Sequence, residues 1–318
     1  MEKDLYVHAS KLKNIDPKDV AIEVNHVTKD YGNGRGIFDI NFVIPRGCTF
    51  GYCGTNGAGK TTTLRSMMGF IKPDSGFVKV NGMDAWKDSE KIKPFIGYLP
   101  GEIAFPAVEN GSQFLKIQAE MINLTDMSRA EELINGLQLD PTANLKRMSK
   151  GMKQKTALVA ALMHKPDIII LDEPTTGLDP LMRDAFINFI KEEKARGATI
   201  IMSNHMFDEL EETCDYVGFI KDGHLLEVVD VQEVQNRPFR EYRLVLGDEK
   251  AFNSIKLNMC EIIAKIDMGY FYIVRVQQNK LNEFFKEIKK FNIKLIKEIQ
   301  YDLEDYFMNE VIGGSTND

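Results

Sequence analysis

The 318-residue sequence has no long hydrophobic run, which excludes a chain that crosses a membrane by itself. Its longest apolar runs, such as residues 168–171, are a few residues long, whereas a membrane-spanning helix needs about 20. The N-terminal stretch MEKDLYVHASKLKNIDPKDV has no apolar core of a secretion signal, and its mixed charge does not fit a transit peptide. We therefore expect a cytoplasmic protein.

Cysteines are few, and charges of one sign do not gather in blocks. The four cysteines, at positions 48, 53, 214 and 260, have neither CxxC metal spacing nor the density of a disulfide scaffold, so we interpret them as packing residues. The formal net charge is −7, with acidic and basic residues interspersed, which argues against a dedicated nucleic-acid surface. We expect no nucleic-acid partner.

A phosphate-binding loop follows the strand-like stretch CTFGYCG. The sequence GTNGAGKTT has GxxxxGKT spacing, in which glycines let backbone N–H groups turn toward phosphate oxygens and the next helix adds a favourable dipole. Lys60 would reach the β- and γ-phosphates, Thr61 would bind Mg²⁺, and Thr62 would bind phosphate. The alternative is a glycine-rich turn before a helix. The candidate nucleotide-binding residues of this loop are Gly54, Thr55, Asn56, Gly57, Ala58, Gly59, Lys60, Thr61 and Thr62.

A pair of carboxylates ends the apolar run at residues 168–171, which is typical of a strand covered on both faces. A buried strand holds a carboxylate rigidly, so Asp172 is the candidate Mg²⁺ ligand. Glu173 is the candidate catalytic residue that orients or deprotonates the attacking water. A further apolar run closes on SNH, and His205 would reach a γ-phosphate if its strand lies beside the P-loop strand. Carboxylates at a strand end and single histidines also occur without such roles.

These motifs, in this order, resemble the nucleotide-binding subunit of an ATP-binding cassette (ABC) transporter over about residues 21–228. The resemblance implies an α/β fold, with a P-loop ATPase core over residues 21–230 and a helical subdomain at about 102–160. It implies ATP and Mg²⁺ as cofactors. It also makes Tyr31 the candidate for stacking on adenine, although packing against its neighbours is the alternative, and it places Asp179 in the D-loop.

The sequence MSKGM, residues 148–152, stands where the family has its LSGGQ signature at a helix start. The family pairs two subunits head to tail, so each ATP is held by the P-loop of one chain and the signature of the other. Ser149 is a good N-cap residue and Gly151 permits close backbone approach, so both keep what a phosphate needs. Lys150 departs from the family glycine. Lys153 and Lys155 either contact polyphosphate or point to solvent, and we expect the helix to end near residue 164.

The loop IGYLPGEIAF also departs from the family, which often has glutamine where Gly101 stands. That glutamine touches Mg²⁺ and senses the membrane partner. We expect water to replace the missing ligand, with a metal site of lower affinity. Glu102 would supply an oxygen only if the loop shifts by one residue.

The chain beyond about residue 231 has no phosphate motif. Residues 241–247, 261–276 and 293–300 have strand patterns with a turn at 267–269, whereas 249–257, 281–291 and 303–311 have helix patterns. The order βαββαβ predicts a small ferredoxin-like α+β domain over 231–318, after an N-terminal extension at 1–20. Either it regulates or steadies the dimer, or it only adds stability.

The resemblance implies an ATP-hydrolysing subunit that energises export of a drug, peptide or other amphipathic cargo. The domain at 231–318 and the sequence SKGMKQK are similar to those of bacterial drug, antibiotic-peptide and polysaccharide exporters. Its partners would be integral-membrane permease subunits and a second nucleotide-binding subunit, as a homodimer or a paralogous heterodimer. It would lie peripherally on the inner face of the cell membrane. The alternative is a soluble ABC ATPase acting as a sensor or as a non-transport factor in translation or DNA repair.

Overall fold

The computed structural model describes residue 12, residues 15–299 and residues 302–308. The chain divides into two compact units, the first ending at Val231 and the second beginning at Gln232. Most of the N-terminal extension predicted at 1–20, and the end of the helix predicted at 303–311, lie outside the described residues.

The first unit is built on a six-stranded sheet with the strand order β10-β9-β3-β8-β7-β6. The central strand β3 pairs in parallel with β8 and β9, and β7 pairs in parallel with β6 and β8. Every residue of β3, β7 and β8 is buried, as their continuous apolar runs predict. The strands are β3 (Thr49–Cys53), β6 (Ile96–Leu99), β7 (Ile168–Asp172), β8 (Thr199–Asn204), β9 (Tyr216–Lys221) and β10 (His224–Asp230).

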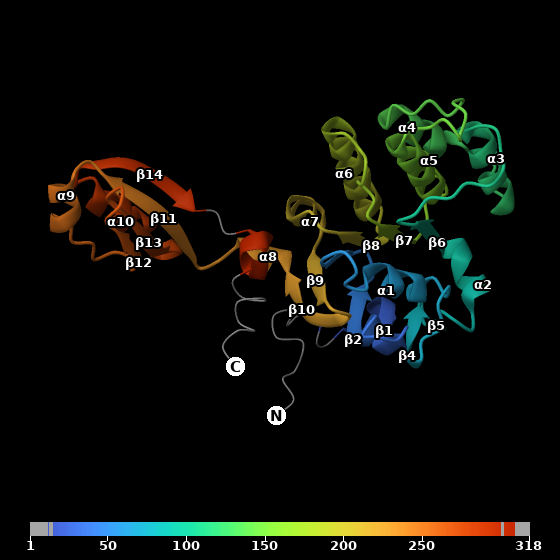
Figure 1. Ribbon diagram of the computed structural model, residues 1–318, viewed down its shortest axis with the longest axis horizontal. Coiled ribbons are helices and arrows are strands. Elements are labelled where there is room, and N and C mark those ends of the chain that lie inside the picture. The colour runs from blue at the N-terminus through green and yellow to red at the C-terminus, as the bar shows by residue number, and fades with distance from the viewer. Residues whose placement is uncertain (1–11, 13–14, 300–301, 309–318) are drawn as a thin grey trace. The chain divides into compact units, whose positions relative to one another are not determined.

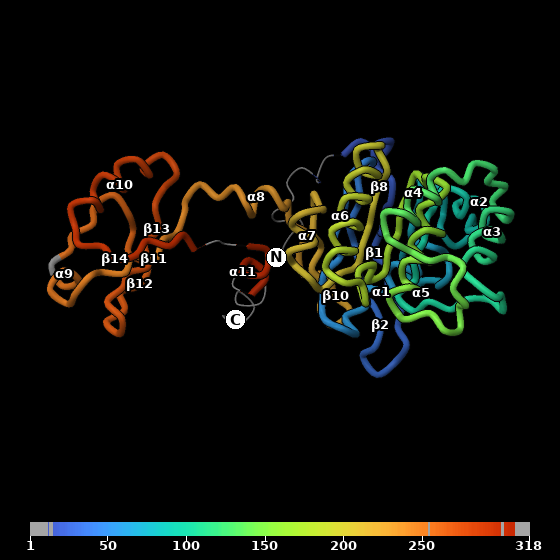
Figure 2. The backbone as a smooth tube through the Cα atoms, turned by 90° about the horizontal axis from the view of Figure 1, so that it is seen from above, coloured from blue at the N-terminus to red at the C-terminus, as the bar shows by residue number. Residues whose placement is uncertain are grey.

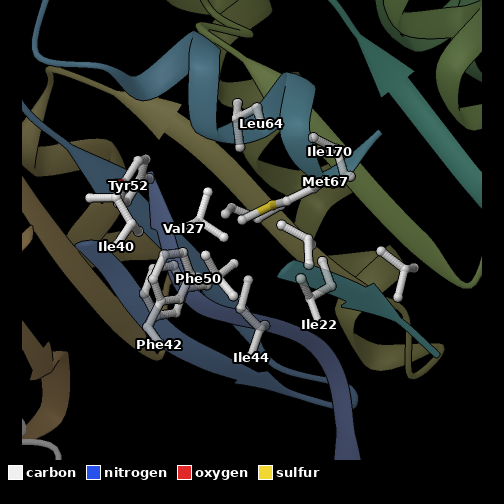
Figure 3. Close-up of a cluster of buried hydrophobic side chains, with 14 of the residues drawn as sticks. Ile22, Val27, Ile40, Phe42, Ile44, Phe50, Tyr52, Leu64, Met67 and Ile170 are labelled. Carbon is white, nitrogen blue, oxygen red and sulfur yellow. The ribbon is translucent and has the colours of Figure 1, made fainter. Parts of the chain in front are cut away.

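An antiparallel sheet with the order β2-β1-β4-β5 packs against the six-stranded sheet and helix α1. Its strands are β1 (Val20–Asp30), β2 (Gly36–Pro45), β4 (Ser75–Val80) and β5 (Met83–Asp84), and α1 is Lys60–Met67. Figure 3 shows side chains from β1, β2, β3, α1 and β7 pointing toward one another in the shared core. The rings of Phe42 and Phe50 stack there with centroids 5.0 Å apart. This core fixes where α1, and therefore the P-loop, stands.

Helices α3 (Gly111–Met121), α4 (Ser128–Gly136) and α5 (Lys150–Leu162) lie together in both views (Figures 1 and 2). They make up the helical part of the first unit. Helix α5 begins after its N-cap Ser149, whose Oγ accepts a hydrogen bond from Met152 N. The remaining helical segments are η2 (Pro17–Asp19), α2 (Ser89–Ile92), η3 (Lys93–Phe95), α6 (Pro180–Ala195) and α7 (Phe207–Thr213).

The second unit has one antiparallel sheet with the order β12-β13-β11-β14. Its elements follow the order β11 (Phe239–Leu246), α9 (Glu249–Ser254), β12 (Glu261–Ile266), β13 (Phe271–Gln277), α10 (Leu281–Ile288) and β14 (Ile293–Ile299). Phe284 and Ile288 of α10 are buried, and Phe284 stacks on Tyr242 at 5.6 Å. Helix α9 is shorter than the 249–257 expected, because Ile255 has an extended backbone. The short helices are α8 (Val231–Gln235), η4 (Gln278–Lys280) and α11 (Leu303–Tyr306).

Among the described residues, none of the helices has both the length and the apolar composition that a bilayer crossing requires.

Candidate functional site

The P-loop connects the end of β3 to α1 and depends on glycine conformations. Gly57 has φ +83° and Gly59 has φ +108°, a left-handed region that side chains rarely adopt. A β-carbon added at Gly59 would also lie 2.6 Å from Ile37 Cγ2. A hydrogen bond from Gly223 N–H to the Ala58 carbonyl also holds the loop in place. The sequence therefore forces a turn that no other residue type at Gly59 would make.

The loop presents unpaired hydrogen-bond donors. In the described part of the chain, the N–H groups of Gly57, Gly59 and residues 60–62 have no hydrogen-bond acceptor. The Lys60 ammonium donates to the carbonyls of Gly54 (2.7 Å) and Thr55 (3.2 Å). A helix N-terminus with free N–H groups and an adjacent ammonium attracts a polyphosphate.

Thr61 and Asp172, from separate parts of the sequence, meet beside this loop. Thr61 Oγ1 donates to Asp172 Oδ2 at 2.7 Å, and Ser203 Oγ donates to Asp172 Oδ1 at 2.6 Å. The Asp172 side chain is buried, so these hydroxyls hold it in one orientation. Burial, and next the charge of Asp172, raise the pKa of Tyr98, which keeps its phenol protonated, whereas a hydrogen bond with Arg65 acts in the opposite direction.

The carboxylate of Glu173 faces the P-loop lysine. Its Oε1 lies 3.8 Å from Lys60 Nζ, and its Oε2 accepts a hydrogen bond from Thr176 Oγ1 at 3.3 Å. Glu173 has φ +49°, an uncommon conformation for a residue with a side chain. Its N–H donates to Ser203 Oγ (2.9 Å) and to the Ser203 carbonyl (3.2 Å), which holds that conformation.

His205 follows β8, which lies between β3 and β7 in the sheet. Asn204 pairs with Cys53, the last residue before the P-loop, and Ser203 pairs with Asp172. The carboxyl ends of three parallel strands therefore bring the P-loop, Glu173 and His205 to one edge of the sheet, where α/β proteins bind ligands. The side chain of His205 is exposed.

The residues predicted to form the signature lie against the segment predicted to form the D-loop of the same chain. A β-carbon at Gly151 would lie 2.6 Å from the Gly177 carbonyl oxygen, so only glycine permits this approach. In the described residues, neither Ser149 nor Gly151 hydrogen-bonds to the P-loop of its own chain. Asp179 caps helix α6 by accepting a hydrogen bond from Met182 N at 3.0 Å.

Tyr31 and Gly101 stand at the margins of the site. The Tyr31 ring is 53% exposed, so it is not a core residue, and Lys29 Nζ lies 5.8 Å from its centroid. A β-carbon at Gly101 would lie 2.9 Å from Asp172 Oδ2, which puts the backbone of this loop directly against the carboxylate. Glu102 is exposed.

Sequence reasoning missed Gln154 and the role of Ser203. Gln154 is buried, and its Nε2 donates to the carbonyls of Glu173 (3.2 Å) and Pro174 (2.8 Å). It ties α5 to the loop after β7. A glutamine inside the first turns of a helix that packs on an apolar strand is the signal that would have found it.

Comparison with known proteins places the chain in a family. Residues 37–176 match the family model described as ABC transporter. The bacitracin transport ATP-binding protein BcrA of Bacillus licheniformis is 34% identical over 307 residues, covering 93% of this chain and 98% of that protein. The linearmycin resistance ATP-binding protein LnrL of Bacillus subtilis is 34% identical over 65% of this chain and 68% of that protein.

A solved ATP-binding subunit of an ABC transporter superposes with a TM-score of 0.63 at 28% identity, covering 68% of this chain and 92% of that one. These similarities support the transport-subunit interpretation and not the soluble sensor that the sequence left open. They also confirm the predicted α/β ATPase core. The chain belongs to the family of ABC transporter ATP-binding proteins and is an ATP-binding, ATP-hydrolysing subunit.

Proposed function

We propose that the P-loop of this chain binds the phosphates of ATP and that Tyr31 stacks on the adenine. The observation that carries the proposal is the set of unpaired N–H groups at Gly57, Gly59 and residues 60–62, beside the Lys60 ammonium. Five donors and one cation suit a triphosphate, because free N–H groups in a glycine loop and at a helix start are a ready anion-binding site. The exposed ring of Tyr31 is available for stacking.

Thr61 and Asp172 fit a magnesium ion. Their oxygens lie 2.7 Å apart beside the P-loop, and Mg²⁺ prefers hydroxyl, carboxylate and phosphate oxygens and keeps some of its waters. The described residues hold no cluster of three or more acidic, histidine or cysteine side chains for a metal, which suits an ion held mainly by the substrate. When bound, the ion neutralises phosphate charge.

Glu173 orients or deprotonates the attacking water, and His205 contacts the γ-phosphate. Glu173 lies 3.8 Å from Lys60, so its carboxylate is on the side of the transferred phosphate. His205 is exposed and follows the strand next to the P-loop strand, so it can reach the same phosphate. Glu173 thus acts on the attacking water, and His205 acts on the charge of the phosphate.

Two copies of the chain, or this chain and a paralogue, complete the sites between them. Ser149 and Gly151 lie at the N-terminus of α5, make no hydrogen bond to their own P-loop among the described residues, and would serve the ATP of the neighbouring chain. Asp179, at the D-loop, would sit at the same interface. An ABC transporter cassette whose solved structure is dimeric shares this fold with a TM-score of 0.60 at 22% identity.

The dimer would energise export of an amphipathic compound through permease subunits, from the inner face of the membrane. The names of two relatives, which refer to bacitracin transport and linearmycin resistance, support cargo of the antibiotic class. An apolar groove of about 390 Å³ between β6 and helices α3 and α5 would receive a helix of the permease, since its lining residues Tyr98 and Pro100 continue into the Gly101 loop. Movement of a permease helix bound in this groove would be transmitted through the Gly101 loop to Asp172.

The second unit, which begins at Gln232, supports the accessory domain that we propose over residues 231–318. Its element order and its strand order β12-β13-β11-β14 support a ferredoxin-like fold. We assign it a regulatory or dimer-steadying role.

The test is a pair of variants measured for ATP binding, turnover and size. Lys60→Ala should lose nucleotide binding or hydrolysis. Glu173→Gln should bind ATP, hydrolyse it slowly and accumulate a dimer on size-exclusion chromatography with ATP. Near-normal turnover in Lys60→Ala would refute the P-loop assignment, and a Glu173→Gln protein that stays monomeric with ATP would refute the two-chain site.

A further inference from the structure

A buried carboxylate outside the nucleotide-binding residues joins three separate segments. Glu209 of α7 is 3% exposed. Its Oε2 accepts hydrogen bonds from Thr175 Oγ1 (2.8 Å), in the loop after β7, and from Asn204 Nδ2 (2.5 Å), at the end of β8. Its Oε1 lies 2.9 Å from Arg183 Nε of α6, an ion pair without the alignment of a hydrogen bond. Because a buried carboxylate is costly unless it is paired, these contacts hold the three segments together.

Asn204 carries this constraint to the neighbouring histidine. Its Oδ1 accepts hydrogen bonds from the backbone N–H groups of His205 (2.7 Å) and Met206 (3.0 Å). An ionised glutamate only accepts hydrogen bonds, so Glu209 requires the NH₂ group of Asn204 to face it. The amide oxygen must then face the backbone of His205. Glu209 therefore sets the orientation of the amide that holds His205.

Thr175 and Arg183 carry the constraint to the loop between Glu173 and Asp179. Thr175 lies within this loop, whose next residue, Thr176, donates from its hydroxyl to Glu173 Oε2 at 3.3 Å. Arg183 N–H donates to the Asp179 carbonyl at 3.0 Å. Glu209 thus contacts Thr175 inside this loop and Arg183 just beyond its end.

We propose that Glu209 is a positioning residue for ATP hydrolysis. It fixes the position of the loop that carries His205 relative to the loop that carries Glu173, without touching the nucleotide. The inference rests on the roles proposed above for Glu173 and His205. In the part of the chain that the structure describes, Glu209 makes no contact with Lys60 or Thr61. Loss of Glu209 should therefore lower kcat and leave ATP binding in place.

The first test replaces Glu209 by alanine. We expect kcat to fall about 10- to 100-fold, since small misplacements of catalytic groups cost this much, while KM and the Kd of a fluorescent ATP analogue stay within about twofold. The matched control is Glu212→Gln, on the same helix, whose exposed carboxylate pairs with Lys191; it should behave like the wild type. A kcat within about twofold of wild type, or an equal loss of ATP affinity and kcat, would overturn the proposal.

The second test exchanges donor and acceptor and does not depend on the alanine variant folding. Asn204→Asp alone puts two carboxylates against each other and should lower kcat about tenfold or more. Adding Glu209→Gln restores the hydrogen bond with the roles exchanged. The new amide nitrogen stands in place of Oε2, so it donates to the introduced aspartate, and the Thr175 hydroxyl turns to accept its second hydrogen while the amide oxygen faces Arg183. Recovery to within about threefold of wild type supports positioning, and no recovery overturns it. Glu173→Gln separates the two proposals. If Glu173→Gln hydrolyses ATP at the normal rate, the proposed site is wrong. If Glu173→Gln is slow but the Glu209 variants hydrolyse ATP normally, only the inference about Glu209 is wrong.

Discussion

The backbone of Gly101 lies against the carboxylate of Asp172, at a position where a β-carbon would be 2.9 Å from Oδ2 and 3.2 Å from Cγ. The Asp172 side chain has no room to withdraw, because it is buried and both of its oxygens are held, by Thr61 and by Ser203. The glutamine that the family often has in this place cannot be accommodated here without moving either the loop or the carboxylate. The departure from the family is therefore built into the packing around Asp172.

Restoring the family residue should harm this protein. We expect Gly101→Gln to raise the Mg²⁺ concentration needed for half-maximal ATPase activity and to lower kcat about tenfold, because the new β-carbon displaces Asp172. Gly101→Ala should have a similar effect, since it carries the same β-carbon. Glu102→Gln, at an exposed position, is the control. A Gly101→Gln protein with tighter Mg²⁺ dependence would mean that the loop moves to admit the side chain.

Sharing of ATP sites between two chains can be tested by mixing variants. In a dimer of one Lys60→Ala chain and one Ser149→Ala chain, one site carries both lesions and the other carries none. We expect each variant alone to be weak and the mixture to recover up to roughly a quarter of wild-type ATPase activity, since about half of the dimers are mixed. If each site belonged to a single chain, mixing would restore nothing.

The guanidinium of Arg129 fastens helix α4 to α6. It lies 2.8 Å from Glu193, which is 2% exposed, and 3.1 Å from Glu192. We expect Arg129→Met to lower the free energy of unfolding by about 1–3 kcal/mol in urea denaturation; the cost is moderated because Glu193 keeps its ion pair with Arg196. Lys191→Met breaks an exposed pair and should cost about 0–1 kcal/mol. Equal costs for the two variants would contradict a structural role for the buried pair.

Alkaline pH should destabilise the fold through its buried thiols. Burial raises the pKa of Cys53 and of Cys214 from 9.0 to about 12, and it also raises the pKa of Cys48. These thiols stay protonated in the folded chain but ionise in the unfolded chain near pH 9, so their contribution is complete below pH 9 and is lost as pH rises toward 12.

The free energy of unfolding should accordingly decrease above pH 9, by up to about 1.4 kcal/mol per pH unit for each thiol. Urea titrations at several alkaline pH values measure the slope. Cys214→Ala should make the slope shallower, and an unchanged slope would show that the loss of stability comes from other groups.

Much of the nucleotide site is predictable because its chemistry is local in the sequence. The turn at Gly57 and Gly59, the ammonium of Lys60 and the hydroxyl of Thr61 are contiguous, so their spacing alone indicates a phosphate loop. The apolar run before Asp172 likewise predicts a buried strand by its composition. The βαββαβ pattern of the last 88 residues, 231–318, also follows from local periodicity, and the structure has these elements in that order.

The sequence by itself determined which residues have the chemistry for ATP, because that chemistry needs particular side chains at short spacing. Only the tertiary structure decided how distant segments meet: Gly101 against Asp172, Gly151 against Gly177, Gln154 on the loop after Glu173, and Glu209 between two loops. These contacts depend on strand order, sheet register and helix packing, which arise from the whole core and leave no local pattern in the chain.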